Sequence, residues 1–336
     1  MLEKASILIV DDDPDILKLL SYTLEKRGYN VVTVGRGIDA IREVERNKFN
    51  IVLLDLKMPG LDGMDTYRRI RVINQDVTVI MMTGYHEEDV LRKALREGIF
   101  SVALKPLDIS KMVSLANLKL INVFYDMTSD EISEIAHITT ECRFSPKEVI
   151  FIPDDPADAV YFLTNGRVRL YQISSEGKEI TLGILQPGDI FGEMETLGQS
   201  RREVFAEAMD TCYACKIDKK PFEKLLQSKP KLALKLIQVM ARRFQQAQSR
   251  IEDMAFRDVT GRLSKLILKL ADEFGEQTSR GTRICVKLTH RDIGNMIGVS
   301  RETTTSTLNN FKKKKLIDFS RRYITILDRK GLDNLV

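Results

Sequence analysis

Short apolar runs rich in β-branched residues alternate with amphipathic segments over residues 6–104. The runs start at SILIV and end at FSVALKP, and the segments between them begin near Pro14, Ile38 and Glu87. Apolar positions in those segments recur with a helical period, which distinguishes them from the strand-like runs. The pattern predicts a doubly wound parallel α/β sheet with helices on both faces.

The pattern changes between about residues 148 and 218, where short strand-like segments are closely spaced. Asn165-Gly166 and Glu176-Gly177 are typical of β-hairpins, because glycine readily takes the backbone angles of tight turns. Several short strands with Pro-Gly corners predict a jelly roll or barrel.

An uninterrupted helical pattern extends from Pro230 to about Asp258. Its apolar positions recur at alternating steps of three and four, the spacing of a two-stranded coiled coil. These positions are Ile237, Met240, Phe244, Ala247, Ile251 and Met254. The spacing predicts a homodimer joined along this seam. A helix that packs the same stripe against its own domain is the alternative.

Two short helices joined by a tight turn are predicted within residues 288–314. Thr289 is a helix N-cap with Asp292 as its capping-box partner, Gly298 ends the first helix, and Ser300 caps the second. This is the helix-turn-helix pattern, which places its second helix in the major groove of DNA. An ordinary helical hairpin with a solvated lysine run is the alternative.

The segment IDFSRRYITIL follows this pattern and predicts a strand pair, a basic wing with Arg321 near its tip. Residues 257–336 contain 17 lysines and arginines against 9 aspartates and glutamates, whereas the whole chain has a net charge of +4. Positive charge gathered in one part of the chain favours contacts with nucleic-acid phosphates there.

No apolar run reaches the roughly 18 residues of a membrane span, and no signal-peptide pattern precedes the first strand, so we expect a cytoplasmic protein without membrane contacts. The four cysteines are too few and too scattered for a disulfide scaffold. Cys212 and Cys215 have the spacing of some metal sites. Because residues three apart on a strand face opposite sides, we expect no metal there.

Polar residues follow the apolar runs of the predicted parallel sheet. Asp11 and Asp12 follow the first run, Asp55 the third, Thr83 the fourth and Lys105 the last. The carboxyl ends of parallel strands meet at one edge, where ligands bind. Three converging carboxylates repel one another unless a hard cation lies among them, and Mg²⁺ is the natural occupant. A hydroxyl and an ammonium group opposite would hold a phosphoryl group on Asp55.

These five positions, within about residues 4–118, resemble the receiver domain of response regulators. The resemblance implies that Asp55 accepts a phosphoryl group from a sensor histidine kinase. It implies Mg²⁺ ligation by the three aspartates, and phosphoryl contacts from Thr83 and Lys105. A receiver-shaped domain that only docks other proteins, without phosphorylation, is the alternative.

One position departs from the receiver pattern. In VALK, Val102 stands where receiver domains usually carry an aromatic side chain whose rotamer follows the threonine. We therefore expect a different route for the signal, a single helix from Ile109 through Val123 into the next domain. The peptide bond between Lys105 and Pro106 is expected to be cis.

The motifs LTxxDIG and GxSRET, followed by LI, resemble the DNA-binding domain of the catabolite-activator and Fnr (Crp/Fnr) regulators. The resemblance implies base contacts from Arg301 to guanine and from Glu302 to cytosine. These regulators usually carry another base-reading arginine one turn later, where this chain has Ser306. Double-stranded DNA and RNA polymerase are the implied partners. Phosphate contacts are expected from Thr289, Arg291, Thr303, Lys312, Lys313 and Arg321.

The segments YFLxxGRVRLY, EGKEITLGIL and PGDIFGE resemble the cyclic-nucleotide-binding fold. In that family a glutamate after glycine binds the ribose and an arginine binds the phosphate, and Gly192, Glu193 and Arg202 match those positions. Glu203 follows the arginine and would repel a phosphate in a partly dry pocket. We expect Arg202 and Glu203 to pair with each other, and we expect no bound cyclic nucleotide.

The predicted architecture is multidomain α/β + β + α. It comprises a flavodoxin-like receiver at 1–118, a cyclic-nucleotide-binding-type β-roll at 119–228, a dimerisation helix at 229–258 and a winged helix-turn-helix at 259–336. The predicted protein is a two-component response regulator of transcription, not an enzyme, in which phosphorylation at Asp55 modulates DNA binding by a homodimer. The alternative is a small-molecule-responsive regulator whose receiver is a passive interaction module.

Overall fold

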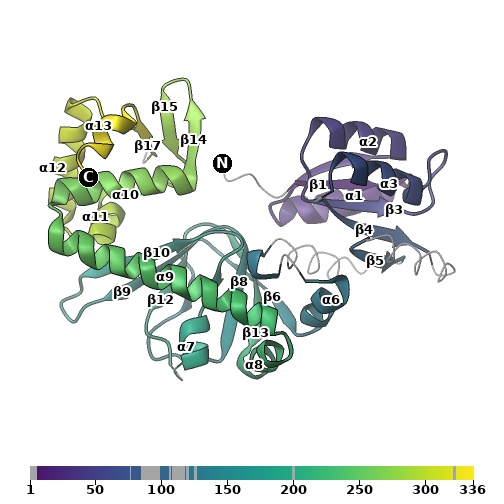
Figure 1. Cartoon of the computed structure of the whole chain (residues 1–336), viewed down its shortest axis with the longest axis horizontal. Coiled ribbons are helices and arrows are strands. Elements are labelled where there is room, and N and C mark those ends of the chain that lie inside the picture. The colour runs from purple at the N-terminus through teal and green to yellow at the C-terminus, as the bar shows by residue number, and fades with distance from the viewer. Residues whose placement is uncertain are drawn as a thin grey trace.

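The fold of the chain is given by a computed structural model (Figure 1). It describes residues 6–75, 77–84, 99–105, 107, 118, 121–124, 127–198, 201–320 and 323–336. An α/β unit, a roll of two sheets and a smaller helical unit follow one another, and one long helix connects the last two.

The first unit contains a five-stranded sheet in which every neighbouring pair of strands is parallel. The strands are β1 (Ser6–Val10), β2 (Asn30–Val34), β3 (Ile51–Asp55), β4 (Thr78–Thr83) and β5 (Ser101–Leu104), in the order β2-β1-β3-β4-β5. The helices are α1 (Pro14–Lys26), α2 (Gly37–Arg46) and α3 (Gly63–Ile73). The predicted α/β sheet is therefore confirmed, while the helix expected from Glu87 lies outside the described residues.

Alternate side chains of β1 enter two different cores. Ile7 and Ile9 pack in the cluster that contains Leu20 of α1, while Leu8 and Val10 pack in the cluster that contains α2 and α3. Side chains alternate between the two faces of a strand, so a sheet covered on both faces needs apolar residues at every position. This is why the strand appears in the sequence as a continuous apolar run.

The segment that leaves this unit is not one straight helix. Residue 118 is helical, but Asn122–Phe124 forms the 3₁₀ turn η1. The predicted helix from Ile109 through Val123 is therefore wrong at its C-terminal end. Leu118, Ile121 and Phe124 are all fully buried in the shared core, and the tight turn brings the last two into it. Pro106, and with it the predicted cis peptide, lies outside the described residues.

The roll contains two four-stranded sheets, in the orders β10-β9-β12-β7 and β11-β8-β13-β6. Their strands are β6 (Thr139–Phe144), β7 (Val149–Phe151), β8 (Ala159–Asn165), β9 (Val168–Ile173), β10 (Glu179–Leu185), β11 (Ile190–Phe191), β12 (Phe205–Ala208) and β13 (Cys212–Asp218). Helices α6 (Ser129–His137), α7 (Glu193–Gly198) and α8 (Lys219–Ser228) flank them. Gly166 and Gly177 have positive φ angles of 82° and 76°, as the predicted hairpins require.

The long helix α9 (Pro230–Phe256) leads into the last unit. That unit contains α10 (Val259–Phe274), β14 (Gly275–Thr278), β15 (Gly281–Ile284), α11 (His290–Ile297), α12 (Arg301–Lys313), β16 (Ile317–Ser320), β17 (Tyr323–Ile326) and α13 (Arg329–Asp333). Its sheet has the order β14-β15-β17-β16. The predicted wing is the β16–β17 pair, whereas the β14–β15 hairpin was not predicted.

One apolar cluster joins the receiver-like sheet to the roll and to the long helix. It includes Ile9 of β1, Phe124 of η1, Phe162 of β8 and Leu236 of α9. Hydrophobic burial on this scale orders the units relative to one another, since separating them would expose their apolar surfaces to water.

Candidate functional site

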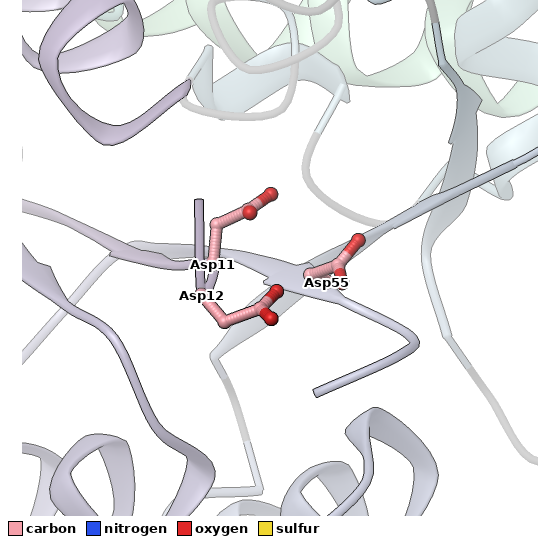
Figure 2. A group of neighbouring side chains, drawn as sticks. All are labelled: Asp11, Asp12 and Asp55. Carbon is pink, nitrogen blue, oxygen red and sulfur yellow. The ribbon is translucent and has the colours of Figure 1, made fainter. Parts of the chain in front are cut away.

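An acidic cluster lies at the carboxyl edge of the parallel sheet. Asp11 and Asp12 follow β1, and Asp55 is the last residue of β3, the strand next to it. One carboxylate oxygen from each of the three side chains lies within 4.8 Å of the others, and Figure 2 shows the three side chains gathered at this edge. Asp11 and Asp55 are buried and Asp12 is exposed. The predicted set of metal ligands is thus brought together.

Lys105 joins the two buried carboxylates of this cluster. Its Nζ lies 2.9 Å from Asp11 Oδ2 and 2.7 Å from Asp55 Oδ1. Burial raises the pKa of Asp55, and the nearby acids add to this, although the hydrogen bond from Lys105 opposes it. Burial lowers the pKa of Lys105, but hydrogen bonds to Asp11 and Asp55 outweigh this and raise it overall. The lysine therefore stays a cation beside Asp55.

Thr83 ends β4, between the strands that carry Asp55 and Lys105. It is buried, and its carbonyl oxygen accepts a hydrogen bond of 2.7 Å from the backbone N–H of Lys105. The sheet ladder pairs Asp55 with Met82 and Thr83 with Leu104. All five predicted positions therefore lie at the end of adjacent strands, around one edge of the sheet.

The helix-turn-helix forms as its local sequence predicts. The Thr289 side chain and Asp292 make both hydrogen bonds of a capping box at the start of α11. Gly298 ends that helix in the left-handed region, with φ of 72°, and the Ser300 side chain accepts from the N–H of Thr303 at the start of α12. These caps fix the turn between the two helices.

Helix α12 has one buried face and one exposed face. Thr304, Leu308 and Phe311 are buried against the rest of the unit. Arg301, Glu302, Thr303, Ser306 and Lys313 are exposed. The predicted base-reading residues thus lie together on a free face of the second helix, while the hydroxyls of Thr289 and Thr303 also serve the caps.

Of the predicted phosphate contacts, two already pair with an acidic side chain and one lies outside the described residues. Lys312 Nζ lies 2.7 Å from Asp318 Oδ1, and Arg321 lies outside the described residues. Arg291 is exposed, but its Nη2 lies 3.3 Å from Oε1 of Glu179 on β10. No pattern in the sequence indicates this last contact.

His290 is a residue that the sequence analysis missed. Its Nδ1 lies 2.8 Å from Thr305 Oγ1, so the side chain joins the start of α11 to α12. Burial lowers its pKa, and the positive charge of Arg301 adds to this. A neutral imidazole is the expected form beside the predicted base reader. A lone histidine next to an N-cap carries no pattern that would have singled it out.

The side chains that match the cyclic-nucleotide site bond mainly to other groups of the protein. Arg202 is buried and donates to the carbonyl oxygens of Gly192 at 2.6 Å and Ala159 at 2.5 Å. Glu193 is fully buried and forms an ion pair with Arg243 of α9. The predicted pairing of Arg202 with Glu203 is therefore wrong, because backbone carbonyls of the roll already accept its hydrogen bonds. The Nη1 and Nη2 atoms of the guanidinium are thus occupied, whereas its buried Nε has no hydrogen-bond partner among the described residues.

The predicted seam of α9 lies mostly on an exposed face. Ile237, Phe244 and Ile251 are 59%, 64% and 69% exposed, and Met254 and Ala247 are exposed as well. Met240 differs, since it packs on the edge of the shared apolar cluster. Leu232 and Leu236 fix the start of the helix to the roll. Most of the stripe therefore remains available to a second chain.

Cys212 and Cys215 lie on opposite faces of β13, in two different apolar clusters. Burial raises the pKa of both thiols to about 12, so neither is a thiolate at neutral pH. Within the described residues, no helix combines the length and the apolar composition needed to cross a membrane.

Three family profiles match successive parts of the chain. They describe a response regulator receiver domain at residues 7–117, a cyclic nucleotide-binding domain at 141–229 and a Crp-like helix-turn-helix domain at 261–335.

Similar proteins cover a little under two thirds of the chain. The global nitrogen regulator of Nostoc sp. is 30% identical over 217 residues, which cover 64% of this chain and 95% of that protein. A CRP-like cAMP-activated global transcriptional regulator of Mycobacterium tuberculosis is 29% identical, over 60% of this chain and 92% of that protein. The structure of a CooA mutant from Carboxydothermus hydrogenoformans has a TM-score of 0.54 and 26% identity, over 64% of this chain and 94% of that one. The chain therefore belongs to the Crp/Fnr family of transcription regulators and carries a response regulator receiver domain in addition.

Proposed function

We propose that the chain is a two-component response regulator in which phosphorylation of Asp55 modulates sequence-specific DNA binding by a homodimer. The observation that carries the proposal is the buried Asp55 carboxylate, set beside Lys105 in an acidic cluster, in a chain that also exposes the face of α12. We keep the boundaries 1–118, 119–228, 229–258 and 259–336 for its four parts.

Asp55 is the proposed phosphoacceptor and the chain a substrate of a sensor histidine kinase, not an enzyme. A carboxylate oxygen of Asp55 forms a bond to phosphorus while the phosphorus–nitrogen bond to the kinase histidine breaks. The imidazole leaves with the electron pair and takes up a proton. Lys105, already 2.7 Å from Asp55, balances the charge on the phosphoryl oxygens, and the hydroxyl of Thr83 is proposed to donate to one of them.

The donor set of the acidic cluster fits Mg²⁺. Asp11, Asp12 and Asp55 offer hard carboxylate oxygens close to one another, and the exposed Asp12 leaves a side on which waters can be kept. When bound, the metal would neutralise the charge of the acids and of the incoming phosphoryl group. The three aspartates would hold it, and Lys105 would keep its contact with Asp55.

DNA recognition is proposed for the exposed face of α12. Arg301 suits the acceptors of guanine and Glu302 the amino group of cytosine, with Ser306 one turn further. Phosphate contacts are proposed for Arg291, Lys312 and the other residues predicted above. RNA polymerase is a proposed partner because the matching relatives are transcription regulators.

Dimerisation is proposed along α9. The exposed stripe that includes Phe244 and Ile251 would bury its apolar surface against the same stripe of a second chain. A twofold axis along this helix would present both copies of α12 to half-sites about one helical turn of DNA apart. The alternative of a ligand-sensing roll is less favoured, because Nη1 and Nη2 of Arg202 already donate to backbone carbonyl oxygens.

DNA selection with the full-length protein tests the proposal. Sequences are selected from a random pool in the presence and absence of beryllofluoride and Mg²⁺, which mimic the phosphoryl group. We expect one enriched palindromic sequence whose dissociation constant changes on adding the mimic, and no change for Asp55→Asn. Asp39→Asn, which alters an acid on α2 of the same domain, should behave like the wild type. Equal affinity for every duplex, or a response that survives Asp55→Asn, would contradict the proposal.

A further inference from the structure

The corner between α1 and β2 is held by the roll through polar contacts. Arg27 Nε and Nη2 donate to Oε1 and Oε2 of Glu141 on β6, both at 3.2 Å. The Tyr213 hydroxyl of β13 donates to the backbone oxygen of Lys26 at 3.1 Å. The Asn165 amide at the end of β8 donates to the backbone oxygen of Arg27, also at 3.1 Å. Adjacent strands of one sheet of the roll thus hold one corner of the receiver.

The backbone of this corner lies against the side chain of Asn165 in the roll. Gly28 has a φ of +89°, and a Cβ added to it would lie 2.4 Å from the amide nitrogen of Asn165. The positive φ favours glycine here, and a Cβ would displace the Asn165 amide that donates to Arg27. The corner is therefore shaped for contact with the roll.

Apolar burial reinforces these polar contacts. Tyr29, the next residue, is 6% exposed and belongs to the same cluster as Cys215 and Ile217 of β13. The Arg27 and Glu141 side chains are only 21% and 23% exposed, which shields their bidentate ion pair from water and salt. A contact of this kind has one preferred geometry.

The helix that ends at this corner begins at the acidic cluster. Asp13 is the N-cap of α1, and its backbone N–H donates to Asp11 Oδ1 at 2.9 Å. The helix has 13 residues and therefore spans about 20 Å. A helix moves as a rigid body, so a shift of its first turn is carried to Lys26 and Arg27 at its end.

Phosphorylation would act on the first turn of this helix. A phosphoryl group adds a charge of roughly −1.5 to −2 beside Asp11, Asp12 and Lys105. Lys105 pairs with both Asp11 and Asp55. A new ion pair between its ammonium group and the phosphoryl oxygens would therefore change the environment of Asp11. Asp11 is itself hydrogen-bonded to the N-cap of α1.

We propose that the face of β6, β8 and β13 is a docking surface for the receiver, and that α1 carries the phosphorylation state of Asp55 to this surface. The inference rests on the proposed function, because it names the route by which phosphorylation reaches the roll. It assigns Arg27 and Glu141 as positioning residues. The shared apolar cluster then continues from the docking surface to Leu236 of α9, the proposed dimer helix.

Charge reversal in the full-length chain tests the route. Arg27→Glu and Glu141→Arg each place like charges across the contact, and the combined variant restores opposite charges. The measured quantity is the ratio of dissociation constants for the selected duplex without and with beryllofluoride and Mg²⁺. We expect this ratio to fall to within about twofold of one in each single variant and to recover in the combined variant. Arg36→Glu, which breaks the exposed pair with Asp39, should keep the wild-type ratio.

Two results overturn the route: single variants that keep the wild-type ratio, or a combined variant that stays uncoupled. A wild-type ratio of one would instead contradict the proposed phosphorylation control.

The docking surface is then tested separately, by thermal unfolding without the mimic. The receiver and the roll should unfold in one transition in the wild type and the combined variant, and in two in each single variant. One transition in all four proteins overturns the docking surface.

Discussion

Glu179 is predicted to weaken DNA binding, and Glu179→Gln to strengthen it. Its carboxylate holds two side chains of the first helix of the helix-turn-helix. Oε1 lies 3.3 Å from Nη2 of Arg291, and Oε2 lies 3.1 Å from Nδ2 of Asn295. Arg291 is a proposed phosphate contact, so Glu179 takes the position of a DNA phosphate. Glutamine keeps the length of the side chain and one acceptor oxygen but removes the charge. Its amide nitrogen cannot accept the hydrogen bonds that Oε2 takes from Asn295 and Arg169.

The size of the effect follows from the exposure of the pair. The Arg291 side chain is 65% exposed, which limits the ion pair to less than about 1 kcal/mol. A free energy of about 1 kcal/mol corresponds to roughly a fivefold gain in affinity. If Arg291 then gains one phosphate contact, the slope of log K against log salt steepens by about 0.9.

The assay is a titration of the selected duplex at several salt concentrations. Glu176→Gln is the matched control, because it removes the same charge from the same hairpin. Glu176 forms its ion pair with the nearby Lys178, at 3.0 Å, and not with the helix-turn-helix. We expect Glu179→Gln to bind more tightly than this control and with a steeper salt dependence. Equal affinity and an equal slope in the two variants would refute the reasoning.

Other predictions concern the dimer, the metal site and the turn. Phe244→Glu should remove about 2 kcal/mol of apolar burial from each chain, so sedimentation should show a dimer weakened roughly a thousandfold, whereas Phe244→Leu stays dimeric. Burial raises the pKa of Asp55 above its ordinary 3.8, and the ionised carboxylate is the metal ligand. The Mg²⁺ affinity, measured by titration calorimetry, should therefore fall as the pH drops through the raised pKa. The pH dependence should be weaker in Asp55→Asn. Gly298→Ala should cost about 1 kcal/mol in urea unfolding because φ is 72°, while Gly183→Ala, in open space with an ordinary φ, should not.

The features that could be predicted from the sequence are those whose causes are local or follow from the periodicity. The capping box of Thr289, the left-handed Gly298 and the Ser300 cap each depend on a few neighbouring residues. The acidic cluster was predictable because a parallel sheet necessarily brings the ends of its strands together. Asp55 and Lys105 are distant in sequence, but the alternation of strands and helices places them at one edge.

The features that could not be predicted depend on pairing between distant segments or on the backbone. Arg202 donates to carbonyl oxygens, which every residue possesses and which therefore leave no mark in the sequence. Glu179 and Arg291 are 112 positions apart, and neither belongs to a recognisable motif with the other. The β14–β15 hairpin was missed because its strands, GEQT and GTRI, are short and mostly polar. Such strands lack the alternation that indicates a half-buried sheet.

The positions of these contacts determine what the roll can transmit. The sheet that contains β6, β8 and β13 holds the receiver, and β10 of the other sheet holds α11 through Glu179. A signal from the proposed phosphorylation site to the DNA-binding helices would therefore pass through the roll. The coupling free energy that such a route transmits is limited by its weakest contact, and each polar contact along it contributes about 1 kcal/mol. A tenfold change in DNA affinity needs about 1.4 kcal/mol, so the apolar cluster that reaches α9 has to contribute as well.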